Sequence, residues 1–160
     1  MRKKQESLLI TCYLICKSQK KSTLLDVACG KGRHAIYFNK KGMNVVGIDL
    51  SKKSIQIAKK NSNKKLQFGV WDMRKVFKQN TFDIVTNLFT SFGYFEKNED
   101  EQKAINAMAL NLKKEGILVI DFMNTKKVIK HLITYEKKTV NEINFKIKRR
   151  LKKNYIIKDI

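Results

Sequence analysis

Short apolar runs alternate with longer segments of helical periodicity from Thr23 onward, and this alternation constrains the fold more than any other feature of the sequence. The runs are too apolar to face water on either side, which is typical of strands buried between two layers of helices. Five strands are expected, at Leu24–Ala28, Asn44–Ile48, Leu66–Trp71, Phe82–Asn87 and Ile117–Ile120. Helices are expected between them, at Arg33–Lys40, Ser51–Asn61 and Asn98–Leu112. The pattern predicts an α/β fold with a doubly wound, mainly parallel sheet.

The pattern changes after Asp121. Asn124 is placed to cap a short helix that runs to about Tyr135. Two segments of strand character follow, Ile143–Ile147 and Tyr155–Ile160, with polar residues between them. These segments predict a C-terminal antiparallel hairpin.

The length of 160 residues suits one domain with one core. No internal repeat and no segment rich in Pro, Gly or Ser divides the chain. We expect a single domain over residues 1–160. Its core lies in residues 23–123, and residues 124–160 add a helix and a hairpin as a lid or edge element.

The net charge of +21 lies mostly at the two ends of the chain. Residues 24–125 hold only +7 of it, against +5 in residues 1–23 and +9 in residues 126–160. Lys supplies 30 of the 35 basic side chains, whereas recognition of phosphates and bases favours the bidentate Arg. We therefore interpret the excess as solvated lysines. The alternative is an RNA-binding module whose basic tail consists of Lys146, Lys148, Arg149, Arg150, Lys152 and Lys153.

The longest apolar run, Leu8–Cys16, has nine residues, whereas a membrane-spanning helix needs about 20. The run resembles a signal peptide, but Lys17–Lys21 stands where a small-residue cleavage site belongs. Three cysteines, an odd number, fit a reducing cytoplasm better than a disulfide scaffold. We expect a helix near Leu8–Lys17 that carries Cys12 and Cys16 as buried thiols. A cytoplasmic location, no membrane partner and no metal site are further expectations.

A glycine-containing segment, Asp26–Ala35, follows the first expected strand. Gly30 and Gly32 permit a tight turn and a close approach of the backbone to a ligand, at the edge where doubly wound sheets bind ligands. The spacing Gly30-x-Gly32-x-x-Ala35 fits the dinucleotide fingerprint, and Asp49 lies 19 residues beyond Gly30, near the position of a ribose-binding acid. Taken alone, this pattern indicates an NAD-dependent oxidoreductase.

Asp26 favours a different ligand. A dinucleotide presents its pyrophosphate to this turn, so a carboxylate at the end of the strand would lie near an anion. Two like charges 4 Å apart repel by about 4 kcal/mol at an effective dielectric constant of about 20. S-adenosylmethionine (SAM) has no phosphate and carries an ammonium and a sulfonium group, so Asp26 fits SAM better.

The residues Asp26-x-Ala28-x-Gly30-x-Gly32 resemble the acid-x-Gly-x-Gly-x-Gly signature of class I SAM-dependent methyltransferases, with Ala28 in the first glycine position. The resemblance continues in order and spacing through Gly47–Ser51, Asp72-Met73, the fourth strand and Leu112–Leu118. It covers about residues 23–123. The resemblance implies a Rossmann-like methyltransferase fold with residues 23–123 as the cofactor-binding core.

The resemblance also implies a SAM site, formed by Asp26, Ala28, Gly30, Gly32, Asp49, Leu50, Asp72, Met73, Asn87 and Leu88. In this site Asp49 would accept both ribose hydroxyls, and Asp72 would accept the adenine amino group, with Met73 against the ring. Asn87 and Leu88 would lie near the transferred methyl group. A helix N-terminal acid at Asp49 or a turn acid at Asp72 would explain either residue alone, but not both at successive strand ends.

The segment after the fourth strand is expected to face the methyl acceptor. Methyltransferases that act on nucleic-acid amino groups often carry an Asn/Asp-Pro-Pro-aromatic motif there, whereas this chain has Asn87-Leu88-Phe89-Thr90. The missing prolines favour a small-molecule acceptor and leave an RNA methyltransferase as the alternative. Ser91 and Tyr94 are candidates to orient the acceptor. His34 is interpreted as a cofactor neighbour or surface residue, and no catalytic residue is assigned.

The strand count differs from the family pattern. The family core usually has seven strands, whereas five strands and a hairpin are expected here, so the chain is expected to stop before the last core strands. This leaves the fifth strand as an exposed sheet edge. We expect the edge to be covered by the hairpin or paired with another chain in a homodimer.

Overall fold

The computed structural model describes residues 22–153 and 155–160. The chain divides into two compact units with the boundary between Phe122 and Met123, and each is described by itself. The single domain over residues 1–160 stays a prediction. The expected helix at Leu8–Lys17 and the thiols of Cys12 and Cys16 lie outside the described residues.

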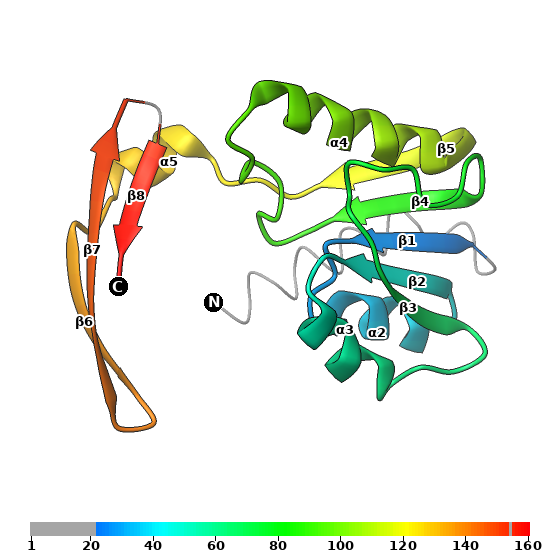
Figure 1. Ribbon diagram of the computed structural model, residues 1–160, viewed down its shortest axis with the longest axis horizontal. Coiled ribbons are helices and arrows are strands. Elements are labelled where there is room, and N and C mark those ends of the chain that lie inside the picture. Colours follow the sequence, from blue (N-terminus) through cyan, green and yellow to red (C-terminus); the bar gives the residue numbers. More distant parts are fainter. Residues whose placement is uncertain (1–21, 154) are drawn as a thin grey trace. The chain divides into compact units, whose positions relative to one another are not determined.

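The first unit contains a five-stranded parallel sheet in the order β3-β2-β1-β4-β5 (Figure 1). Its strands are β1 (Thr23–Val27), β2 (Asn44–Asp49), β3 (Leu66–Val70), β4 (Phe82–Asn87) and β5 (Leu112–Ile120). Its helices are α2 (Arg33–Lys40), α3 (Lys52–Lys59) and α4 (Asn98–Asn111). The predicted doubly wound α/β fold is therefore confirmed, and β5 lies at the edge of the sheet as expected.

Apolar side chains cover both faces of the parallel sheet. One core cluster joins Leu24 of β1 to Phe38 of α2 and Ile55 of α3. A second cluster joins Leu25, the next residue of β1, to Met108 of α4. Because successive strand residues point to opposite faces, the sheet is packed between α2 and α3 on one side and α4 on the other.

The strand order places a topological switch point at β1. This strand pairs in parallel with β2 on one side and β4 on the other, so that Asp26 lies opposite both Gly47 and Thr86. Chain connections leave β1 and β4 in opposite directions at their carboxyl ends. Such a point opens a crevice at the sheet edge and is where doubly wound proteins bind ligands.

The element boundaries in the first unit agree closely with the sequence, with one exception. Ser51 caps α3 as expected, since its hydroxyl oxygen accepts a hydrogen bond from the Ser54 amide at 3.2 Å. The fifth strand begins at Leu112 and not at the predicted Ile117. Leu112 pairs with Phe82 of β4, and Glu115 has a left-handed φ of 63° at the irregularity that follows. Pairing with β4 therefore determines where β5 begins, and local sequence propensity did not predict this start.

The second unit contains α5 (Thr125–Lys130) and a three-stranded antiparallel sheet in the order β6-β7-β8. The strands are β6 (Tyr135–Val140), β7 (Ile143–Lys152) and β8 (Tyr155–Asp159). The Asn124 side chain caps α5 as predicted, by accepting a hydrogen bond from the Lys127 amide at 3.0 Å.

The predicted hairpin corresponds to β7 and β8, and β6 is an additional strand. The expected end of the preceding helix near Tyr135 was wrong, because α5 ends at Lys130. Tyr135 instead begins β6 and pairs with Lys148 of β7. Across the described residues, no helix is long and apolar enough to cross a membrane.

Candidate functional site

The glycine loop, residues 28–32, connects β1 to α2 and has an unusual backbone. Ala28, Gly30 and Gly32 all have left-handed φ values, of 58°, 56° and 81°. A Cβ on Gly32 would lie 2.7 Å from the Phe68 ring, whereas a Cβ on Gly30 would meet nothing within 4 Å. Gly32 is therefore required by packing, and Gly30 leaves open space in front of the loop.

Asp49 ties the glycine loop to the start of α3. Its Oδ2 accepts a hydrogen bond from the Gly30 amide at 2.8 Å, and its Oδ1 accepts one from the Ser51 amide at 2.8 Å. Each carboxylate oxygen keeps a second lone pair, because such an oxygen accepts two hydrogen bonds. Asp49 is therefore a fixed carboxylate that can accept two further donors.

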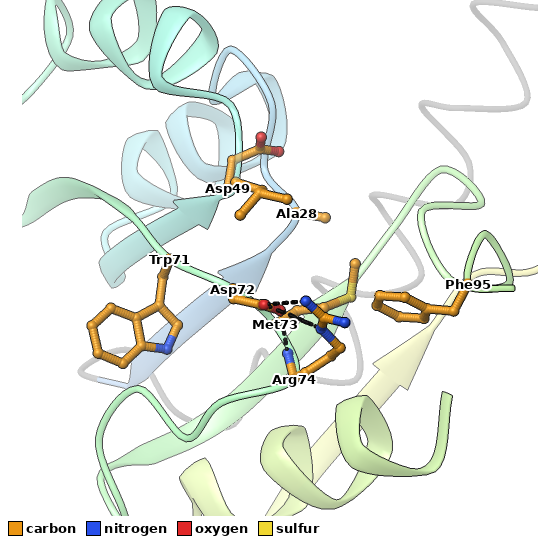
Figure 2. Close-up of a pocket in the computed structure, with 8 residues that line it drawn as sticks. Ala28, Asp49, Trp71, Asp72, Met73, Arg74 and Phe95 are labelled. Carbon is orange, nitrogen blue, oxygen red and sulfur yellow. Dashed lines mark hydrogen bonds and ion pairs between the residues drawn. The ribbon is translucent and has the colours of Figure 1, made fainter. Parts of the chain in front are cut away.

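Two cavities lie at the carboxyl edge of the parallel sheet, and both are lined by Ala28 and Asp49. The smaller has a volume of about 190 Å³ and is also lined by Leu50, Trp71, Asp72, Met73, Arg74 and Phe95 (Figure 2). The larger has a volume of about 480 Å³, and its lining includes Gly30, His34, Leu88, Phe89 and Ser91. Ala28, at the start of the glycine loop, and Asp49 thus lie where the two cavities adjoin.

Asp26 lies beneath the loop and lines neither cavity. It is 1% exposed, and its Oδ1 accepts a hydrogen bond from the Thr86 hydroxyl at 3.0 Å, while its Oδ2 is buried with no partner. Burial raises the pKa of the Asp26 carboxyl to about 7, and the negative charge of Asp49 contributes in the same direction. Burial therefore disfavours the ionised form of this carboxyl, and a nearby cation would favour that form.

Asn87 is the last residue of β4, Leu88 follows it, and Ser91 lies just beyond them. Asn87 is fully buried, with its Nδ2 donating to the Val27 carbonyl at 3.1 Å and its Oδ1 without a partner. The Ser91 hydroxyl donates to the Leu88 carbonyl at 3.0 Å, and both residues line the larger cavity. Tyr94 is 78% exposed and lines neither cavity. The structure thus brings Ser91 to the site but not Tyr94.

Asp72 lines the smaller cavity and is bound by Arg74. The Arg74 guanidinium donates to both Asp72 oxygens, with the shortest bond, from Nη2 to Oδ2, at 2.7 Å. Figure 2 shows this contact, with Met73 and the Phe95 ring beside it. The Arg74 hydrogen bonds hold the pKa of Asp72 below its usual range. Sequence reasoning selected Asp72 and Met73 but missed Arg74, although an acid and an Arg two residues apart in a turn can form such a pair.

Phe89 and Arg33 form a wall of the larger cavity. Phe89 has a left-handed φ of 67°, and its amide donates to Asp121 Oδ2 at 3.1 Å. The Arg33 guanidinium carbon lies 5.0 Å from the centre of the Phe89 ring. Asp121, directly after β5, thus holds the backbone of Phe89 in the segment that follows β4.

His34 lies beside the same ring, with a centroid distance of 6.4 Å to Phe89. Burial lowers the pKa of His34 to about 4, and the Arg33 charge contributes in the same direction. Arg33 Nη2 lies 3.3 Å from His34 Nε2. Because a guanidinium only donates, Nε2 accepts and the imidazole proton lies on Nδ1. His34 is therefore neutral at pH 7, with Nε2 engaged.

Metal ligation has no support in the described part of the chain, where no group of three or more His, Cys, Asp or Glu residues could hold an ion. The absence of a metal site stays a prediction, since residues 1–21 and 154 lie outside that part.

The fold and the site together define a class of protein. A doubly wound sheet, a left-handed glycine loop after β1 and acidic residues at or after the ends of β1, β2 and β3 form a ligand-binding edge of the Rossmann-like type. The particular family follows from sequence comparison, since a profile described as "Methyltransferase domain" matches residues 18–158. The chain belongs to the methyltransferase domain family.

Curated relatives match along part of their length. A dTDP-3-amino-3,4,6-trideoxy-alpha-D-glucopyranose N,N-dimethyltransferase of Streptomyces venezuelae is 34% identical over 62% of this chain and 42% of its own. A Bacillus subtilis protein named as a methyltransferase is 33% identical over 74% of this chain and 49% of its own. The chain thus spans somewhat less than half the length of these relatives.

Solved structures share the fold over most of the chain. A SAM-dependent methyltransferase from Clostridium acetobutylicum aligns with a TM-score of 0.78 and 20% identity, over 94% of this chain and 63% of its own. A SAM-bound amino pentose methyltransferase from Micromonospora echinaspora aligns with a TM-score of 0.75 and 22% identity, over 94% of this chain and 64% of its own. These likenesses confirm the fold expected from the resemblance.

Proposed function

We propose that this chain binds SAM at the carboxyl edge of its parallel sheet and transfers the methyl group to a small-molecule acceptor. The observation that carries the proposal is the position of Asp49, a fixed carboxylate that lines both cavities and still has an open lone pair on each oxygen. Two carboxylate oxygens suit a vicinal diol. The ribose would therefore lie at Asp49, between an adenine space and a methionine space.

The residues of the site fit SAM in charge and in shape. Gly30 leaves open space where any other residue would place a Cβ. Asp26 Oδ2 and Asn87 Oδ1, both buried without a partner, supply negative potential close to the loop. Leu50 and Met73 would contact the adenine from the smaller cavity. Asp26 would act through the loop, since it lies beneath it and lines neither cavity.

The alternative cofactor NAD fits this site less well. Its pyrophosphate would lie at the glycine loop, above a carboxyl that burial already disfavours as an anion. A cationic ligand relieves this cost, whereas an anionic ligand adds to it. The electrostatics of Asp26 therefore support SAM over a dinucleotide.

When bound, SAM supplies a methyl group on a sulfonium whose leaving group is a neutral thioether. The chain then has to align the acceptor with that methyl group, an effect worth up to about 7–11 kcal/mol. Leu88, Phe89 and Ser91 line the larger cavity and are placed to orient an acceptor. His34 is a poor general base because Arg33 engages its Nε2 and its pKa is low.

The acceptor class is supported by the relatives. Two proteins similar to this chain are named as an N,N-dimethyltransferase for a dTDP-amino sugar and an amino pentose methyltransferase. A small amine-bearing molecule is therefore the acceptor class that we propose. We propose a cytoplasmic location on the basis of the cysteine content described above.

Isothermal titration calorimetry tests the cofactor assignment directly. The wild-type chain is expected to bind SAM and S-adenosylhomocysteine but not NAD. Asp49→Asn is expected to weaken SAM binding by about 10- to 100-fold, because a charge-assisted hydrogen bond contributes about 1.5–3 kcal/mol. Thermal unfolding is measured in parallel, since Asp49 also holds the Gly30 and Ser51 amides.

Glu115→Gln is the matched control. Glu115 is an exposed carboxylate in the amino half of β5, away from the carboxyl edge of the sheet. The substitution removes the same charge and should leave the SAM affinity unchanged. Saturable NAD binding without SAM binding would overturn the proposal, and an unchanged affinity in Asp49→Asn would refute the ribose assignment.

A further inference from the structure

Both oxygens of the Asp72 carboxylate accept hydrogen bonds from a single residue, Arg74. Its Oδ1 accepts hydrogen bonds from the Arg74 amide and from Arg74 Nε, both at 3.0 Å. Its Oδ2 accepts from Arg74 Nε at 3.1 Å and from Arg74 Nη2 at 2.7 Å. The one Nε–H is shared between the two oxygens, so three N–H groups of Arg74 occupy most of the roughly four acceptor sites that a carboxylate offers.

Arg74 is itself held from two further sides. Its Nη1 donates to Asp100 Oδ2 at 3.0 Å, in the first turn of α4. Its guanidinium carbon lies 5.4 Å from the centre of the Phe95 ring. Asp72, Arg74 and Phe95 all line the smaller cavity, so the guanidinium forms part of its wall. The side chain is nevertheless 37% exposed, which leaves it room to move away.

We infer that Arg74 determines how this site recognises adenine, by competing with the exocyclic amino group of the cofactor for the Asp72 carboxylate. The inference rests on the proposed SAM function. A new donor to Asp72 would meet a carboxylate whose two oxygens both already accept from Arg74, so it would compete with the Arg74 bonds, first with the shared Nε–H. The contact between Asp72 and the amino group therefore contributes little net affinity while Arg74 is present.

The displacement of Arg74 is energetically feasible. Exposed ion pairs contribute little to stability, because solvent screens them and long side chains lose freedom when they form. Arg74 can also keep its contacts to Asp100 and Phe95 when it loses one of its hydrogen bonds to Asp72. The competition should therefore tune the cofactor affinity without abolishing it.

Arg74→Gln tests the inference, because it removes the guanidinium group, with its N–H donors, and its positive charge. We expect SAM to bind about two- to fivefold more tightly to the variant, the range that corresponds to loss of an exposed ion pair. The second readout compares S-adenosylhomocysteine with S-inosylhomocysteine, in which a carbonyl oxygen replaces the amino group. The affinity ratio of the two ligands should increase in the variant, which loss of structure alone would not produce. Added salt should reduce the difference between the variant and the wild type, because it screens the ion pair.

Lys103→Gln is the matched control, because Lys103 pairs with Asp100, the other acid that Arg74 contacts, at 3.0 Å. It removes one positive charge from the same cluster and should leave both readouts unchanged.

If Arg74→Gln lowers the unfolding temperature strongly, Arg74→Lys replaces it, and an intermediate increase in affinity is expected. Equal or weaker SAM binding by the Arg74 variants, with normal binding by the wild type, would overturn the inference. Absence of SAM binding by the wild type would instead overturn the proposed function.

Discussion

The two sheets of this chain bury their strands in different ways. In the parallel sheet, Leu24 and Leu25 are adjacent and both fully buried, because helices cover both faces. In the antiparallel sheet of the second unit, β7 alternates charged and apolar residues, and Ile147 is its only buried residue. A buried parallel sheet exposes polar groups mainly at its strand ends, and the carboxylates of this site are found there.

The difference also separates the charges of the molecule. Acidic residues follow the strands of the parallel sheet, whereas the antiparallel sheet is basic. Lys146, Lys148 and Arg150 are alternate residues of β7 and therefore share one face. Tyr135 lies opposite Lys148 on that face. The strand register thus places these positive charges on one face of the second unit, whereas the residues that define the candidate site belong to the first unit.

Matched Leu→Ala substitutions should show the largest contrast between the sheets. Leu25 is fully buried in β1, whereas Leu151 in β7 is 48% exposed. Leu25→Ala should lower the free energy of unfolding by about 3–5 kcal/mol, because it leaves a cavity, and Leu151→Ala by less than about 1 kcal/mol. Urea denaturation followed by circular dichroism measures both. Equal losses would mean that the two sheets are buried alike.

The same difference explains what the sequence could predict. The bounds of β4 and α2 agree with the expected segments to the residue, because β-branched residues mark β4 and apolar residues at helical spacing mark α2. β6, with the sequence YEKKTV, was missed because its central residues are charged and its strand character comes from pairing with β7. Tertiary pairing is not visible in local propensity.

The pH dependence of stability should distinguish a buried acid of the parallel sheet from an exposed acid of the antiparallel sheet. Burial raises the pKa of Asp26 from 3.8 to about 7, so the folded chain binds more protons than the unfolded chain between these values. Wild-type stability should therefore fall as the pH rises from about 4 to 7, by at most about 4 kcal/mol from this group. Asp26→Asn should remove the dependence, so the variant should gain stability over the wild type at pH 8 and lose that advantage at pH 4.

Glu136→Gln in β6 provides the comparison. A hydrogen bond from Arg149 lowers the pKa of Glu136, so its contribution is present at neutral pH and is lost as the pH falls below the usual range of a Glu carboxyl. The substitution should therefore change stability slightly and with the opposite sign to Asp26→Asn. Thermal unfolding of both variants across pH 4–8 measures the two trends. An advantage of Asp26→Asn over the wild type that does not change between pH 4 and pH 8 would refute the buried-anion interpretation.

The candidate site was predicted in part. Positions of residues in the glycine loop and at strand ends follow from topology, so Gly30, Asp49 and Asp72 were expected at one edge before any side chain was placed. Side-chain partners do not follow from topology. The strand pattern does not reveal that Arg74 donates hydrogen bonds to both oxygens of Asp72. Nor does it reveal that Tyr94 is exposed while Ser91 lines the larger cavity.

Neutralising the basic face of β7 should have the smallest effect. Lys146→Gln combined with Lys148→Gln changes exposed side chains, so stability should change by no more than about 0.5 kcal/mol. The SAM affinity should change by less than about twofold, because neither lysine lines either of the two cavities. Binding of single-stranded RNA, measured at two salt concentrations, completes the experiment. Tight binding that falls steeply with salt and is weakened by the substitutions would support the RNA alternative, because release of counterions from phosphates gives that dependence. Weak binding that the substitutions leave unchanged would assign these lysines to solvation and leave the carboxyl edge of the parallel sheet as the functional region.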